Sequence, residues 1–158
     1  MKRSDVILVF GRICSGKSSF QSGAHRIVVS DIVRKLINSN DRAQLQNTQH
    51  LDEKIGEEIL HQMESYDYLM SHELIRTHNI VIDGIRQPSI VKYILERFPE
   101  AHLIWLDVPT EIRRRRYETR NAEKDTESFD EADNRPIELE GQEIFSIFKD
   151  QMEIIYNG

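Results

Sequence analysis

The stretch that decides the fold is VILVFGRICSGKS, residues 6–18. Its first five residues are apolar and end at a glycine, which is typical of a strand buried on both faces in a parallel sheet. The last eight residues match the pattern G-x-x-x-x-G-K-S/T. A buried strand that runs directly into this pattern predicts a P-loop, whose backbone N–H groups bind phosphates.

Each residue type in this glycine loop has a physical role. Glycines let the backbone come close to an anion, Lys17 brings a positive charge to the outer phosphates, and Ser18 offers a hydroxyl ligand to Mg²⁺. A helix that begins near Lys17 would add its positive N-terminal end. We therefore expect ATP and Mg²⁺ as cofactors, with a glycine turn and a surface lysine as the alternative interpretation. The expected cofactor-binding residues are Gly11, Arg12, Cys14, Ser15, Gly16, Lys17, Ser18 and Ser19.

Similar patterns repeat along the chain. Further apolar runs occur at 27–29, 80–82, 103–106 and 154–156, and helical periodicity occurs at 31–37, 51–63, 68–75, 89–98, 111–121 and 140–148. Strands that alternate with helices predict an α/β fold with a doubly wound, five-stranded parallel sheet, here the P-loop NTPase fold. We expect one domain over 1–158, with a helical acceptor-binding segment at about 31–77 and a short lid at about 121–139.

Composition excludes several classes of protein. The net charge of −6 argues against a general nucleic-acid surface, which needs a basic face. The single cysteine, Cys14, cannot form an internal disulfide, and the six histidines lack metal-ligand spacing. The first apolar run is too short for a signal peptide or a membrane span. We expect a cytoplasmic enzyme that is a monomer or small homo-oligomer, binds small nucleotides, and binds neither membranes nor nucleic acid polymers.

Two further segments place a carboxylate and, three residues later, an arginine after a predicted strand. They are Asp31 with Arg34 and Asp83 with Arg86. Ligands of such sheets bind at the carboxyl ends of the strands, where the planar fork of an arginine suits a phosphate. The alternatives are an N-cap for Asp31, a turn residue for Asp83, and solvated surface arginines.

These segments resemble the adenylate kinase-like nucleoside monophosphate kinases, in particular their short-lid, adenylate kinase-related and dephospho-coenzyme A kinase-like members. Residues 29–34, VSDIVR, resemble the family's G-D-x-x-R element, with Ser30 in place of glycine. Residues 82–86, IDGIR, resemble its D-G-F-P-R element without the proline. The resemblance implies that Arg34 and Arg86 grip the acceptor phosphate and that Asp83 reaches Mg²⁺ through water.

The densest charge is the run Arg113–Arg116 followed by Arg120. On a helix Arg113, Arg116 and Arg120 share one face, where like charges repel unless an anion lies among them. In the resembled kinases two arginines four apart stand at the entry of the lid, which matches Arg116 and Arg120 and leaves Arg113 a lesser candidate. The resemblance also makes Arg135, and less strongly Asp133, candidates from a lid at 125–135. A solvated basic face, balanced by acidic residues at 123–133, is the alternative.

The sequence thus predicts an ATP-dependent phosphotransferase that acts on a nucleoside or deoxynucleoside monophosphate. The expected catalytic residues are Lys17, Arg86, Arg116, Arg120 and Arg135, and the expected substrate-binding residues are Asp31, Arg34, Asp83 and Arg86, with Ser18 and Asp83 at the metal. Base recognition would fall to Gln46, Thr48 and Gln49. The alternatives are a dephospho-coenzyme A kinase with Asp31 as its base and a non-catalytic nucleotide-binding switch. A GTPase is disfavoured because no Asn-Lys-x-Asp element follows the fourth predicted strand.

Overall fold

The protein is described here from a computed structural model. The structure describes residues 5–38, 51–73, 79–120 and 127–157, with only the backbone described over 69–73. The expected base-reading residues Gln46, Thr48 and Gln49 lie outside the described residues.

Five parallel strands form one sheet: β1 (Val6–Gly11), β2 (His25–Val28), β3 (Ile80–Asp83), β4 (His102–Asp107) and β5 (Met152–Tyr156). Their order is β2-β3-β1-β4-β5, so the strand that carries the glycine loop lies in the centre. The apolar side chains on both faces of β1 are buried, as a continuous apolar run predicts. The expected P-loop NTPase fold with a five-stranded parallel sheet is confirmed.

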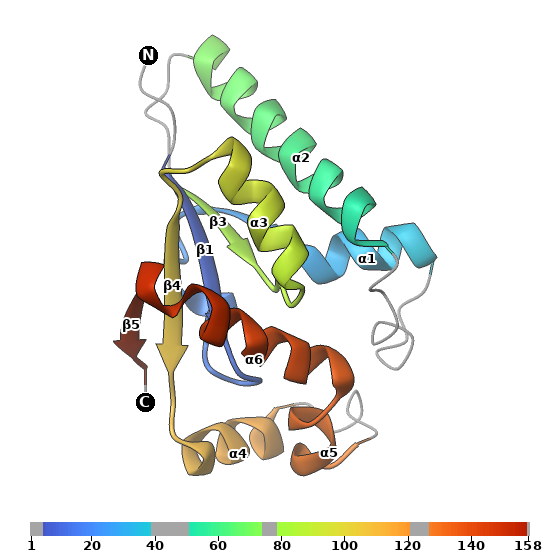
Figure 1. Cartoon of the computed structure of the whole chain (residues 1–158), viewed down its shortest axis with the longest axis vertical. Coiled ribbons are helices and arrows are strands. Elements are labelled where there is room, and N and C mark those ends of the chain that lie inside the picture. The colour runs from blue at the N-terminus through green and yellow to red at the C-terminus, as the bar shows by residue number, and fades with distance from the viewer. Residues whose placement is uncertain (1–4, 39–50, 74–78, 121–126, 158) are drawn as a thin grey trace.

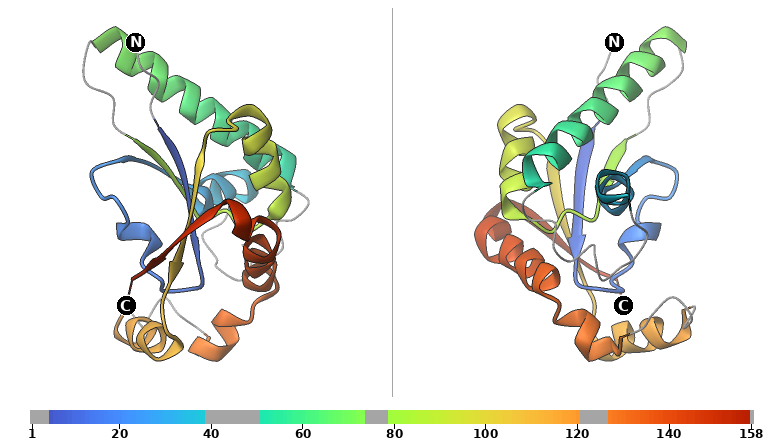
Figure 2. Two further views of the ribbon diagram at one scale, coloured as in Figure 1. Left: turned by 60° about the vertical axis from the view of Figure 1, so that its left-hand side comes forward. Right: turned by 90° about the vertical axis from the view of Figure 1, so that its right-hand side faces the viewer.

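One face of the sheet carries most of the long helices. Residues of α1 (Val29–Ile37), α2 (Asp52–Glu73), α3 (Pro88–Arg97) and α6 (Pro136–Phe148) share a single hydrophobic cluster with that face. Figure 2 shows these helices on one side and the segment that follows β1 on the other. The other face buries a smaller cluster, against which Phe20, Ala24 and Ile155 pack.

Two helices lie beyond the carboxyl ends of the strands. The arrows of β1 and β4 point toward α4 (Thr110–Thr119) and α5 (Phe129–Asp133) in Figure 1. Tyr117 of α4 meets Phe129 of α5 edge to face, with the ring centroids 5.8 Å apart. Both helices therefore lie beyond the edge of the sheet at which ligands of open α/β sheets bind. Among the described residues no helix has the length and hydropathy of a membrane span.

Three sequence-based expectations about helices are wrong. The glycine loop is followed by a single 3₁₀ turn, η1 (Lys17–Ser19), because the serines and Gly23 in 18–23 favour turns over helix. The two helical stretches expected at 51–63 and 68–75 are joined without a break in α2, since its buried stripe runs through Ile59, Met63 and Tyr66. The expected lid at 121–139 lacks apolar periodicity and is expected to be irregular, but its described part, 127–139, contains α5 and the start of α6. A second 3₁₀ turn, η5 (Lys149–Gln151), links α6 to β5.

Candidate functional site

A pocket of about 350 Å³ opens at the carboxyl edge of the sheet. The glycine loop forms one wall, and the ends of β2 and β3, the start of α1, Arg120 and the start of α6 form the others. The lining residues that the sequence predicts for the site are Cys14, Ser15, Gly16, Lys17, Ser18, Arg34, Asp83, Arg86, Arg120 and Arg135. Groups from five separate segments thus converge on one cavity, although their individual roles stay predictions.

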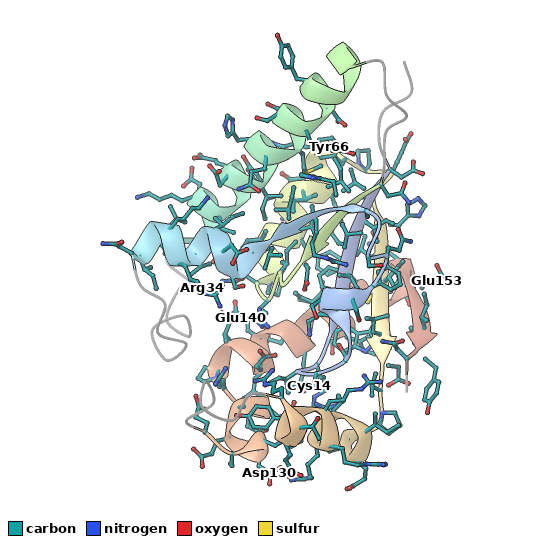
Figure 3. The ribbon with its side chains drawn as sticks, turned by 180° about the vertical axis from the view of Figure 1, so that it is seen from behind. Cys14, Arg34, Tyr66, Asp130, Glu140 and Glu153 are labelled. Atoms are coloured by element: carbon teal, nitrogen blue, oxygen red, sulfur yellow. The ribbon has the colours of Figure 1, made fainter. Side chains whose placement is uncertain are left out.

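The glycine loop needs its glycines for two different reasons. At Gly11 an added Cβ would lie 2.2 Å from the Ser15 Oγ, so the loop can fold back on itself only without a side chain there. Gly16 has a φ of +93°, which side chains rarely adopt, and a Cβ there would lie 2.3 Å from the Asn157 Nδ2. Cys14 also has a positive φ, 60°, and lies where the loop meets α4 in Figure 3.

Lys17 turns its side chain back over the loop. Its Nζ donates hydrogen bonds to the carbonyls of Gly11 and Arg12, each at 2.9 Å. Burial, and next the positive charge of Arg86, lowers the pKa of Lys17 to about 8. A bound phosphate would favour the charged form of this lysine and raise its pKa again.

Nucleotide binding is therefore expected to weaken above about pH 8. Lys17 loses its proton in the free protein at that pH, whereas the bound state holds the proton to a higher pH. Affinity should fall about twofold between pH 7 and 8 and then more steeply, approaching about tenfold per pH unit. Fluorescence titration with a labelled ATP analogue in the absence of Mg²⁺ measures this. Lys17→Met should bind weakly with no such fall, and constant wild-type affinity up to pH 9.5 would contradict the prediction.

The predicted acceptor arginines both line the pocket, and each has a carboxylate partner. Arg34 donates to Asp31 at 2.8 Å and projects from α1 on the side that faces α6 (Figure 3). Arg86 donates from its Nε to Glu138 at 2.8 Å. Asp31 is not an N-cap, because α1 begins two residues earlier at Val29. Its side chain is 63% exposed and does not line the pocket, so it faces solvent beside Arg34.

The arginines expected on one face of a helix do not form one cluster, and Arg120 lies just after α4, which ends at Thr119. Arg116 donates to the carbonyls of Cys14 and Asn157, at 3.1 and 2.8 Å, and does not line the pocket. Arg120 does line it, with its guanidinium over the ring of Tyr117. The expected pairing of Arg116 with Arg120 as a phosphate clamp is therefore not what this geometry presents, because Arg116 supports the backbone of the glycine loop.

Arg113 and Asp133 form a buried ion pair. Arg113 is 1% exposed and donates to Asp133 at 2.8 Å and to the carbonyl of Ile13 at 3.3 Å. Asp133 also accepts from Arg12 of the glycine loop. The anion that the arginine face requires is thus a carboxylate of the protein itself, so Arg12, Arg113 and Asp133 tie α4 and α5 to the loop instead of meeting a ligand in the pocket.

Three of the expected loop residues lie at the margin of the site. Gly11 and Arg12 line a smaller neighbouring cavity together with Arg86 and Glu138. Ser19 is exposed, donates to the carbonyl of Gly16 and lines neither cavity. Arg135 faces the pocket while paired with Glu127 at 2.7 Å.

The residues at the expected metal position suit Mg²⁺. Ser18 and Asp83 line the same pocket and offer only oxygen ligands. Magnesium bound with a nucleotide takes one or two protein oxygens and fills its shell with phosphate and water. Among the described residues, no group of three or more His, Cys, Asp and Glu could hold a metal. A site of this kind would therefore bind the ion together with the nucleotide, and the ion would neutralise phosphate charge there.

Sequence reasoning missed two residues of the site. Glu138 is buried, lines the pocket and pairs with Arg86, but within the expected lid at 121–139 it belongs to no motif. Asn157 donates from its side chain to the carbonyl of Ser15 at 2.9 Å, although 142 residues separate the two. Only the pairing of β5 with β4 brings Asn157 to the glycine loop.

Comparisons with known proteins agree with this fold. A shikimate kinase from Bacteroides thetaiotaomicron superposes with a TM-score of 0.54 and 14% identity, covering 97% of this chain and 86% of that one. A gluconokinase from Sinorhizobium meliloti 1021 gives a TM-score of 0.49 and 15% identity, covering 98% and 83%. At 14% identity the shikimate kinase supports the fold alone, and the gluconokinase, with a TM-score below 0.5, adds no argument. No curated protein sequence matches significantly.

A protein-family model described as an AAA domain matches residues 7–138. That range begins in β1, includes the whole glycine loop and reaches Glu138 in α6. The chain therefore belongs to this AAA domain family of P-loop proteins.

Proposed function

We propose that the protein is an ATP-dependent phosphotransferase that acts on a small phosphorylated acceptor, a nucleoside or deoxynucleoside monophosphate. The observation that carries the proposal is the convergence of Arg34, Arg86, Arg120 and Arg135 on the pocket that contains the glycine loop. Phosphoryl transfer is catalysed mainly by positioning and by positive charge around the moving group. The fold shared with a shikimate kinase is consistent with such chemistry.

The reaction would proceed by direct transfer. An oxygen of the acceptor phosphate attacks the terminal phosphorus of ATP, a new P–O bond forms, and the bond from that phosphorus to the bridging oxygen breaks with ADP as the leaving group. Lys17 binds the donor phosphates, whereas Arg34 and Arg86 hold the acceptor, and Arg120 and Arg135 neutralise charge on the transferred group. An acceptor that is already an anion needs no general base.

The position of Asp31 favours a phosphate acceptor over a hydroxyl acceptor. A kinase that acts on a hydroxyl benefits from a carboxylate within hydrogen-bond reach of that hydroxyl. Asp31, the base considered for dephospho-coenzyme A, is exposed, pairs with Arg34 and lies outside the pocket lining. The phosphate acceptor requires no such residue.

A coupled assay that measures ADP release across nucleoside monophosphates, deoxynucleoside monophosphates and dephospho-coenzyme A tests the proposal. We expect turnover with at least one monophosphate. Arg34→Ala and Arg86→Ala should each raise the acceptor KM about 10-fold or more, since a hydrogen bond to a charged group contributes about 1.5–3 kcal/mol. Arg115→Ala, an exposed arginine outside the pocket lining, is the matched control.

Two outcomes would redirect the assignment. Turnover with dephospho-coenzyme A alone would establish a hydroxyl acceptor. Tight ATP binding without transfer to any member of the panel, unchanged in both arginine variants, would favour a nucleotide-binding switch.

A further inference from the structure

Two hydrogen bonds fix the guanidinium of Arg86. Its Nε donates to the Glu138 Oε1 at 2.8 Å, and its Nη1 donates to the carbonyl of Gly84 at 3.1 Å. A guanidinium has five N–H donors in one plane, so two bonds to different partners determine the orientation of that plane. Within the described part of the chain the Nη2 group of Arg86 donates no hydrogen bond. The edge of the guanidinium formed by Nη1 and Nη2 therefore keeps N–H donors for a ligand in the pocket.

Glu138 is placed by the first turn of α6, which packs on Arg86. A Cβ added at Gly141, one turn further along α6, would lie 3.5 Å from the Arg86 Cγ, so the backbone of the helix passes close beside the stem of this arginine. Glu138 is 7% exposed and lines both cavities that Arg86 lines. The helix that pairs with the guanidinium of Arg86 thus also lies beside its stem.

The carboxylate of Glu138 is ionised in this position. Burial by itself would raise its pKa, but the positive charges of Arg86 and Lys17 lower the pKa below the ordinary value. A buried carboxylate beside a phosphate site would repel the ligand if it were free. Because the carboxylate is paired with the Nε of Arg86, it instead orients the guanidinium. The edge of the guanidinium away from the Nε stays open to a ligand.

We propose that Glu138 is a positioning residue for acceptor binding, which holds the Nε side of Arg86 so that the opposite edge of the guanidinium faces the acceptor anion. The proposal rests on the proposed function only in assigning Arg86 to the acceptor. A bidentate phosphate contact requires the arginine plane to be set before the ligand arrives, since ordering a long side chain on binding costs affinity.

The ion pair itself can be tested without any substrate. In protein labelled with ¹⁵N-arginine, the Nε–H signal of Arg86, assigned by its loss in Arg86→Lys, should exchange slowly with water. Glu138→Ala should abolish this protection, Glu138→Gln should keep part of it through its amide oxygen, and Glu143→Gln, exposed on the same helix, should leave it intact. Full protection in Glu138→Ala would overturn the proposal.

The role in binding is tested with inorganic phosphate as the probe, titrated while saturating ADP occupies the glycine loop. We expect the phosphate Kd to rise at least fivefold in Glu138→Ala and less in Glu138→Gln, with the ADP Kd changed by less than twofold in Glu138→Gln. Unchanged or tighter phosphate binding in both variants would overturn the proposal, since Glu138 would then only repel anions. Failure of wild-type protein to bind ADP would instead count against the proposed function, and the arginine signal would still decide the pairing.

Discussion

Lys17→Met is expected to lower kcat/KM for phosphoryl transfer by about a hundredfold to a thousandfold, the range seen when a preorganised charge or donor is removed from a transition state. Lys17 brings a full positive charge to the donor phosphates, and methionine preserves most of its length and apolar stem. The loss should appear in kcat as well as in the ATP KM, because charge on the moving group is greatest in the transition state.

Lys54→Met is the matched control, since Lys54 is exposed on α2 and lines neither cavity. It should leave both constants unchanged. Initial rates at varied ATP, combined with circular dichroism of each variant, separate a catalytic effect from unfolding. A folded Lys17→Met variant with wild-type kcat/KM would remove the glycine loop from the mechanism.

Asp133→Ala is expected to have the largest effect on stability, a loss of about 3–5 kcal/mol in the free energy of unfolding. The substitution leaves the guanidinium of Arg113 buried without its carboxylate partner, and it also removes the carboxylate that pairs with Arg12. For a chain of this size the change corresponds to a fall in Tm of about 6–20 °C. Chemical denaturation with urea gives the free energy directly.

Asp130→Ala provides a stringent comparison, because Asp130 lies in the same helix and pairs with an arginine of α4 as well. Its side chain is 71% exposed and its contact to Arg114 is a surface ion pair. Such pairs contribute about 0–1 kcal/mol. Equal destabilisation by the two substitutions would show that burial of the Arg113–Asp133 pair carries no special weight.

The fold was predictable because its signal is local. A continuous apolar run on β1, repeated before each crossover, distinguishes a two-sided parallel sheet from other architectures. Boundaries were less predictable. The helix expected after Lys17 is only a turn, since the loop pattern says nothing about the residues that follow it, and the α5 helix was hidden in a stretch without apolar periodicity.

The sequence predicted which residues lie at the candidate site, but not which side chains pair with one another there. Asp83, Arg34 and Arg86 could be placed at one edge because each follows a buried strand in a parallel sheet. Glu138 could not, because its relevance depends on α6 folding back over Arg86, which lies 52 residues earlier in the chain.

By itself the sequence determined a phosphate-binding loop on a central parallel strand. Such a loop binds phosphate with the backbone amides of consecutive residues, so all of its binding groups lie in one short stretch of sequence. Only the tertiary structure decided which arginine faces the pocket. Helical spacing predicts that Arg113, Arg116 and Arg120 share one face, but α4 ends at Thr119. Asp133 pairs with Arg113, the carbonyl of Cys14 accepts from Arg116, and Arg120 lies after the helix and lines the cavity. Helical periodicity predicts the direction in which a side chain points. The group that it meets there comes from a distant part of the chain, which periodicity does not reveal.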